Sequence, residues 1–93
     1  MSFNHTFAAL ADPNRQAILT ALRKEELAVA AIATNLNITL PTLSHHLDVL
    51  KRAGLISARR SGRQIFYSLN MSVLEEISES LVKFIKGKNL SNK

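Results

Sequence analysis

The sequence predicts a single, mainly α-helical domain with one β-hairpin placed before its last helix. Three observations lead to this prediction. The first half of the chain has apolar residues at helical spacing, interrupted by good helix caps. The stretch "LISARRSGRQIFYSLN" is instead rich in Ile, Phe and Tyr around Ser61-Gly62, which indicates two strands and a turn. Helical spacing then returns, so the predicted order is four helices, a hairpin and a fifth helix.

Length and composition limit what the chain can do. It has 93 residues, which form one domain at most, with a core that is marginal alone. Cysteine is absent, which excludes disulfides and thiolate metal sites and leaves a second subunit as the expected added support. Neither a secretory signal nor a membrane-spanning run is visible, so we expect a cytoplasmic protein. The net charge of +5 weakly favours a polyanionic partner.

The first two helices are predicted from their apolar faces and one strong cap. Residues 3–10 place Phe3, Phe7 and Leu10 on one face at helical spacing. Asp12 is a good N-cap for the next helix, and Pro13 suits the first helical position, where no backbone donor is missed. The buried stripe expected for this second helix consists of Ala17, Ile18, Leu19 and Leu22.

Two short helices follow, joined by a tight turn. After a loop containing Glu25-Glu26, "LAVAAIATNLNI" predicts a helix that ends at Asn37, a residue that tolerates the left-handed conformation. Thr39 can cap the next helix, which runs to Ala53 and is stopped by Gly54. Such a pair is a helix-turn-helix, and a hairpin directly after it makes the winged helix-turn-helix variant. The inner face expected for the first of the two helices consists of Val29, Ile32, Ala33 and Leu36.

The last helix is predicted to begin with a capping box and to end at a glycine. Ser72 and Glu75 match the S-x-x-E pattern, and Gly87 is the expected end. The domain would therefore cover residues 1–87, with residues 88–93 as a flexible polar tail. The apolar face of this helix consists of Leu74, Ile77, Leu81 and Ile85, with Val73 and Phe84 beside it.

The two adjacent histidines of "TLPTLSHHLDVLKRAGLI" should point in different directions. At about 100° per residue, the leucines at 43, 47 and 50 define the buried side of this helix. His46 lies near the edge of that side, where we expect a partly buried ring hydrogen-bonded to backbone. His45 lies almost opposite, among exposed positions. The pair therefore does not form one metal site.

Basic residues are concentrated around the predicted hairpin. From Lys51 to Gln64 the chain contains no acidic residue. Three arginines close to one turn repel one another unless an anion balances them, and nucleic-acid phosphates are such anions. Gly62 allows a tight turn there. The basic residues of this stretch are Lys51, Arg52, Arg59, Arg60 and Arg63.

Three stretches together resemble a known bacterial family. "ADPNRQAILTAL", "LSHHLDVLKRAGLI" and "RRSGRQIFYSLN" are similar to hallmark stretches of the ArsR-type winged helix-turn-helix repressors, over residues 3–85. Within that family, the short cysteine-free chain and its "YSLN" ending resemble the autorepressor subgroup of the Sdp toxin-immunity system. The resemblance implies a homodimeric, sequence-specific DNA-binding repressor that acts on its own operon. It also implies relief by a sequestering protein or membrane partner.

The site residues follow from the motif and from the resemblance. The N-terminal part of a recognition helix meets base edges in the major groove, which selects Leu40, Pro41, Thr42, Ser44 and His45. The wing would hold the DNA backbone through Arg59, Arg60, Ser61, Arg63 and Gln64. ArsR-type proteins dimerise through their first and last helices, which here implies an interface of Phe3, Phe7, Leu10, Leu74, Ile77, Leu81 and Ile85. Because the dimer is symmetric, we expect its operator to be an imperfect palindrome in double-stranded DNA.

Residues that this family uses for sensing are missing from the sequence. Many members bind metal through a cysteine pair in "ELCxC", where this chain has "ELAVA" with Ala28 and Ala30. Other members bind zinc through histidines near the C-terminus, and residues 72–93 contain none. We therefore expect no metal, no other cofactor and no enzymatic activity, since no catalytic motif is visible either. Two alternatives stay open: a winged-helix protein-interaction module, and a metal-responsive regulator with a non-standard site.

Overall fold

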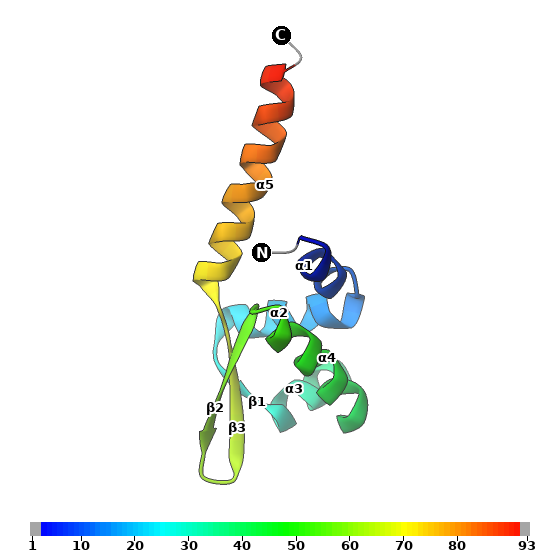
Figure 1. The fold of residues 1–93 in the computed structure, drawn as a ribbon. Coiled ribbons are helices and arrows are strands. Elements are labelled where there is room, and N and C mark those ends of the chain that lie inside the picture. The colour runs from blue at the N-terminus through cyan, green and yellow to red at the C-terminus, as the bar shows by residue number, and fades with distance from the viewer. Residues whose placement is uncertain (1–2, 92–93) are drawn as a thin grey trace.

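The computed structural model confirms the helical domain with a hairpin wing, and Figure 1 shows its arrangement. It describes the backbone of residues 3–91 and the side chains of residues 5–87. The hairpin and the last helix extend from the helical body in opposite directions, and the molecule measures 56 × 22 × 21 Å. The elements are α1 (Phe3–Leu10), α2 (Pro13–Lys24), β1 (Leu27–Ala28), α3 (Val29–Leu36), α4 (Leu40–Arg52), β2 (Ile56–Ser61), β3 (Gln64–Leu69) and α5 (Met71–Ser91).

The predicted caps of the helix-turn-helix region form as expected. The Asp12 carboxylate accepts hydrogen bonds from the backbone N–H groups of Asn14 and Arg15, at 2.7 and 3.1 Å. Asn37 takes the left-handed conformation, with φ of 54°, and ends α3. Helix α4 ends at Arg52, and Gly54, with φ of 78°, follows its cap residue. Local side-chain chemistry therefore sets the boundaries of α2, α3 and α4.

A short strand that the sequence did not predict completes a three-stranded sheet. Leu27 pairs with Tyr67 and Ala28 pairs with Phe66, so β1 lies antiparallel to β3 in a sheet of order β1-β3-β2. The prediction that these two residues begin the α3 helix was wrong. Without β1, the backbone donors and acceptors on that edge of β3 would lie unpaired, and pairing keeps Leu27 and Ala28 extended. The wing is thereby attached to the helical body.

The core lies where the α2, α3 and α4 stripes meet the base of the hairpin. Predicted members such as Ile18, Ile32 and Leu43 are fully buried, which confirms the inner faces assigned to these helices. Asn70 adds a polar contact, because its side chain donates to the Gly54 carbonyl (2.8 Å) and accepts from the Ser57 hydroxyl (2.6 Å). This contact holds the end of α4 against the junction of hairpin and last helix.

Helix α5 differs from its prediction at both ends. It begins at Met71, and the Leu74 backbone N–H donates to the Asn70 carbonyl at 3.2 Å, so the predicted Ser72–Glu75 capping box does not form. It also continues through Gly87 to Ser91, because the helix penalty of one exposed glycine, about 1 kcal/mol, does not end a helix. The division into a domain of residues 1–87 and a tail of 88–93 stays a prediction. None of the described helices is long and apolar enough to cross a membrane.

Candidate nucleic-acid interface

The first turns of α4 present a row of exposed side chains. All five residues predicted for base contact are exposed there, and Leu40, the first residue of the helix, is 56% exposed. The Thr39 hydroxyl donates to the Thr42 hydroxyl at 2.9 Å and accepts from the Thr42 backbone N–H at 3.4 Å. Thr39 therefore caps the helix and also fixes the position of the Thr42 side chain. The predicted residues are Leu40, Pro41, Thr42, Ser44 and His45.

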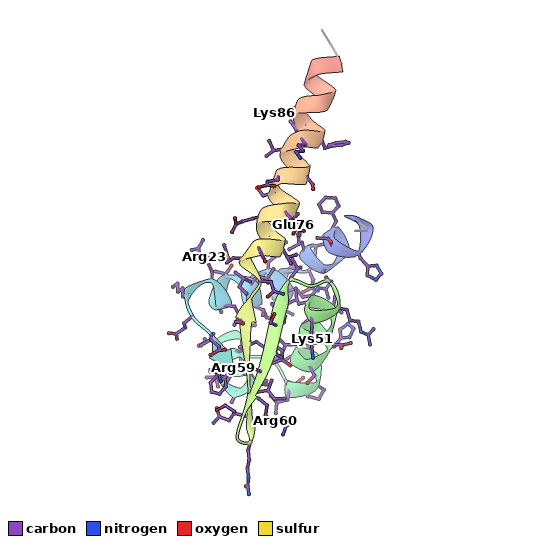
Figure 2. All side chains as sticks on the ribbon, turned by 60° about the vertical axis from the view of Figure 1, so that its left-hand side comes forward. Arg23, Lys51, Arg59, Arg60, Glu76 and Lys86 are labelled. Atoms are coloured by element: carbon purple, nitrogen blue, oxygen red, sulfur yellow. The ribbon has the colours of Figure 1, made fainter. Side chains whose placement is uncertain are left out.

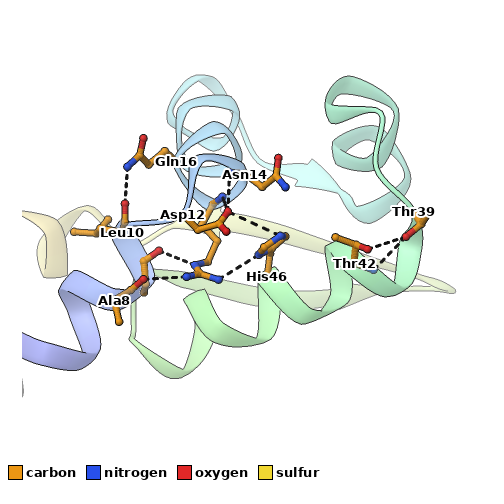
Figure 3. A network of polar contacts seen from close by, with 10 residues as sticks. Ala8, Leu10, Asp12, Asn14, Gln16, Thr39, Thr42 and His46 are labelled. Carbon is orange, nitrogen blue, oxygen red and sulfur yellow. Dashed lines mark hydrogen bonds and ion pairs between the residues drawn. The ribbon is translucent and has the colours of Figure 1, made fainter.

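His46 points into the protein and joins α4 to the start of α2, as Figure 3 shows. The residue is 7% exposed, and its Nδ1 lies 3.3 Å from a terminal guanidinium nitrogen of Arg15. Arg15 also donates to the carbonyls of Ala8 and Ala9 at the end of α1. The expected burial of His46 is confirmed, but the partner of its Nδ1 is the Arg15 side chain and not the predicted backbone group.

The Arg15–His46 contact sets which nitrogen of the ring accepts a hydrogen bond. A guanidinium can only donate, so Nδ1 accepts, and the neutral ring carries its proton on Nε2. That nitrogen lies 4.0 Å from the Asp12 carboxylate. Loss of water contact alone would raise the pKa of Asp12. Backbone hydrogen bonds from Arg15 and Asn14 outweigh this effect and lower the pKa, with help from the nearby positive charge of Arg15.

His45 faces away from this network. The two imidazole rings have centroids 5.7 Å apart and are tilted by 53°, and His45 is exposed. Among residues whose side chains the structure describes, no group of three or more histidines and carboxylates could hold a metal ion. The prediction that the two rings point in different directions is confirmed, because His46 is buried and His45 is exposed. His45 thus stays available on the outer surface of α4.

The tip of the wing carries exposed basic and polar side chains. The two-residue loop between β2 and β3 starts at Gly62, whose φ of 63° is strained for residues with a side chain. Figure 2 shows Arg60 close to this turn. Arg63 lies in the turn itself, and Ser61 and Gln64 form the last strand pair before it. All four of these side chains are exposed.

Arg59 behaves differently from the other wing arginines. It donates from Nε and from a terminal nitrogen to the two carboxylate oxygens of Glu26, at 2.8 and 2.6 Å. Its guanidinium carbon also lies 4.9 Å from the centroid of the Phe66 ring. The hydrogen bond from Arg59 lowers the pKa of Glu26, and the same bond raises the pKa of Arg59. The stretch from Lys51 to Gln64 contains no acid, but Glu26, outside that stretch, balances the charge of Arg59.

An apolar surface extends along the outer half of α5 and onto α1. Phe7, Ser80, Leu81 and Phe84 line a hollow of about 140 Å³. Phe84 is 70% exposed, the largest value among the exposed large hydrophobic residues of the described chain. We call the exposed residues of this region the α1–α5 apolar surface: Phe7, Leu81, Val82, Phe84 and Ile85.

The predicted dimer interface divides between this surface and the core of the protomer. Ile77 is 6% exposed and belongs to the core, and Leu10 and Leu74 pack against that core. These three residues therefore stabilise the single chain. The two on α5, Leu74 and Ile77, lie in its first turns, which are against the body, while later turns of the helix extend beyond it (Figure 1). Phe7, Leu81 and Ile85 are exposed, and the side chain of Phe3 lies outside the described residues. Val82 and Phe84 were not in the predicted interface, although Phe84 was placed beside its stripe.

Comparison with known proteins identifies the family. A family model described as a helix-turn-helix domain matches residues 10–58. The transcriptional repressor SdpR of Bacillus subtilis (strain 168) is 42% identical over 87 residues, which cover 92% of this chain and 97% of that protein. An ArsR-like transcriptional regulator from Rhodococcus sp. RHA1 superposes with a TM-score of 0.87 at 28% identity, over 92% of this chain and 79% of that one. The chain belongs to the ArsR family of winged helix-turn-helix regulators.

A second solved structure describes an assembly. It is the homodimeric winged helix-turn-helix DNA-binding domain of a possible ArsR-family regulator from Mycobacterium bovis. It has a TM-score of 0.74 and 33% identity, and the match covers 98% of this chain and 83% of that one.

In the present ArsR-family chain, Ala28 ends β1 and Ala30 lies in the first turn of α3. These are the positions that the family resemblance assigned to a sensing cysteine pair, and alanine offers no donor atom there.

Proposed function

We propose that this chain is a homodimeric repressor that binds double-stranded DNA by sequence. The observation that carries the proposal is the placement of the exposed N-terminal part of α4, with Thr42, Ser44 and His45, beside an arginine-bearing wing. Leu40 and Arg63 line the same hollow. The N-terminal part of a recognition helix enters the major groove, and a basic hairpin next to it can hold the flanking phosphates. The repressor names of relatives such as SdpR support the same function.

Each α4 residue would have a limited and specific role. Thr42, fixed by Thr39, and Ser44 can donate to base edges or phosphates, and Leu40 can contact a thymine methyl group. The His45 ring can donate a hydrogen bond to a base edge in the same groove or accept one from it. Arg60 and Arg63 at the wing tip would contact phosphates or enter the minor groove. Among the wing residues, Ser61 and Gln64 would add neutral contacts to the backbone.

The proposed assembly is a symmetric dimer formed through the α1–α5 apolar surface. Two recognition helices would then enter successive major grooves about 34 Å apart, so the proposed operator is an imperfect palindrome. Occupying a promoter in this way blocks transcription, and the proposed target is the operon that encodes the repressor. A protein with this function acts in the cytoplasm and requires no enzymatic activity. Its release from DNA would come from a protein or membrane partner that sequesters the dimer.

The test compares two groups of alanine variants by fluorescence anisotropy on operator DNA and on scrambled DNA. Arg60→Ala and Arg63→Ala should weaken binding to both DNAs and reduce the salt slope by about 0.9 for each lost phosphate contact. Thr42→Ala and His45→Ala should instead reduce the preference for operator DNA, by roughly tenfold for a good base contact.

Lys86→Ala is the matched control, because it removes one positive charge at the opposite end of the molecule (Figure 2). It should leave the affinity and the salt slope close to those of the wild type. If Arg60→Ala and Lys86→Ala behave alike, the wing does not contact DNA. If Thr42→Ala and His45→Ala leave the sequence preference unchanged, α4 is not the recognition helix.

A further inference from the structure

Glu26, Arg59 and Phe66 form one connected row across the three-stranded sheet. Arg59 on β2 lies opposite Phe66 on β3, and Phe66 lies opposite Ala28 on β1. The Arg59 guanidinium extends over the Phe66 ring and meets the carboxylate of Glu26, which precedes β1 by one residue. We call this contact the Glu26–Arg59 bridge. It joins the wing to the segment that connects α2 with α3.

The bridge lies where the attachment of the wing is short. Strand β1 has two residues and pairs with β3 at two positions. A bidentate carboxylate contact fixes the guanidinium in orientation as well as in distance, unlike a single hydrogen bond. The Phe66 ring supports the other side of the same group. The bridge is therefore a second attachment of the hairpin to the segment before α3, beside the short β1–β3 pairing.

The wing arginines differ in whether an acidic residue of the chain pairs with them. In the described part of the chain, Arg59 forms an ion pair, whereas Arg60 and Arg63 do not. Moving Arg59 onto a DNA phosphate would leave the Glu26 carboxylate without its partner beside a polyanion. Retaining the bridge avoids that repulsion and leaves Arg60 and Arg63 to meet the backbone.

We propose that Glu26 and Arg59 are positioning residues that hold the wing in register for DNA, and that Arg59 is not itself a phosphate ligand. The proposal rests on the proposed function, because it assigns a role within DNA binding. It changes the role predicted for Arg59 from the sequence. It also gives a role to Glu26, an acidic residue that charge alone would class as unfavourable near DNA.

The decisive variant is Glu26→Gln, for which the two roles predict opposite results. If Arg59 were a phosphate ligand, removing the carboxylate would free it, and binding would tighten with a steeper salt slope. If the bridge positions the wing, Glu26→Gln should weaken operator binding by about threefold, the size that a well-formed surface pair supports. Arg59→Gln should weaken it similarly, and the double variant should be no weaker than Arg59→Gln alone.

Glu25→Gln is the matched control, since it makes the same charge change at the neighbouring exposed position. It should leave binding unchanged or slightly tighter. All affinities are measured at a temperature where circular dichroism shows every variant to be folded. If the bridge only stabilised the fold, the affinities of the folded variants for DNA would then be equal. Unchanged or tighter binding by Glu26→Gln, or additive losses in the double variant, overturns the proposal.

A measurement without DNA separates this proposal from the proposed function. Amide hydrogen exchange of β1 and β3 should be faster in Glu26→Gln than in Glu25→Gln, because the bridge limits opening of the hairpin attachment. Equal exchange rates would show that the bridge does not hold the wing. If the wild type fails to bind its operator while exchange still differs, the proposed function is refuted and the bridge remains only a fold contact.

Discussion

Phe84 offers the sharpest test of the proposed dimer. This residue is 70% exposed on the outer half of α5, where it lines a hollow together with Phe7 and Leu81. In a symmetric interface each contact occurs twice, so one substitution removes two aromatic rings. We expect Phe84→Ala to convert the dimer into a monomer at concentrations where the wild type is dimeric.

The magnitude follows from exposed area. A phenylalanine side chain buries about 200 Å², so roughly 140 Å² remains available on each Phe84. At about 25 cal/mol per Å², full burial of both rings would stabilise a dimer by about 7 kcal/mol. The stabilisation is smaller if the partner covers the rings only in part. We therefore expect Phe84→Ala to weaken dimerisation by about 3 to 6 kcal/mol, which is at least a hundredfold in the dimerisation constant.

Sedimentation equilibrium over a concentration series measures that constant. Lys83→Ala is the control, because at about 100° per residue position 83 lies on the side of α5 opposite Leu81. Circular dichroism verifies that both variants fold. A dimerisation constant for Phe84→Ala within threefold of the Lys83→Ala value would refute the assignment of the interface to the α1–α5 apolar surface.

Two further predictions concern stability. Gly54→Ala should lower the free energy of unfolding in urea by about 1–2 kcal/mol, because the φ of 78° disfavours a side chain although nothing lies within 4 Å of the added carbon. Gly87→Ala, inside helix α5, should instead leave stability unchanged or raise it, and equal losses in both would contradict the argument. The pKa of Glu26 is lowered in the folded chain by the Arg59 hydrogen bond, so its stabilising effect is present above the ordinary glutamate pKa and disappears as pH falls through the lowered value. The thermal midpoints of wild type and Glu26→Gln should therefore differ at pH 7 and converge as the pH falls below the lowered pKa of Glu26, and a difference that persists in acid would contradict this cause.

The features that sequence predicted well are set by neighbouring residues. Asp12, Asn37 and Gly54 each act within a few positions along the chain, through a cap or a left-handed backbone. After Gly54, the backbone N–H of Leu55 donates to the Leu50 carbonyl at 3.0 Å, which closes the end of α4. Such chemistry is visible in a short window of sequence, so these helix ends could be predicted.

The features that sequence missed depend on distant partners. Strand β1 exists because β3, some forty residues later in the chain, offers an edge, and Arg59 meets Glu26 across a separation of 33 residues. Periodicity showed that Ile77 and Leu81 share one face of a helix. It did not show where that helix leaves the body, which is why Ile77 belongs to the core and Leu81 is exposed.

The central claim is that the chain reads DNA as a sequence-specific dimer. The most direct measurement is fluorescence anisotropy of the purified wild-type protein on DNA from upstream of its own gene, against scrambled DNA, across a salt series. The proposed function predicts tight binding that prefers the native sequence, saturates at one dimer per site and weakens steeply with salt. Equal and weak binding to both DNAs would contradict it, and would leave only the general attraction of a basic protein for a polyanion.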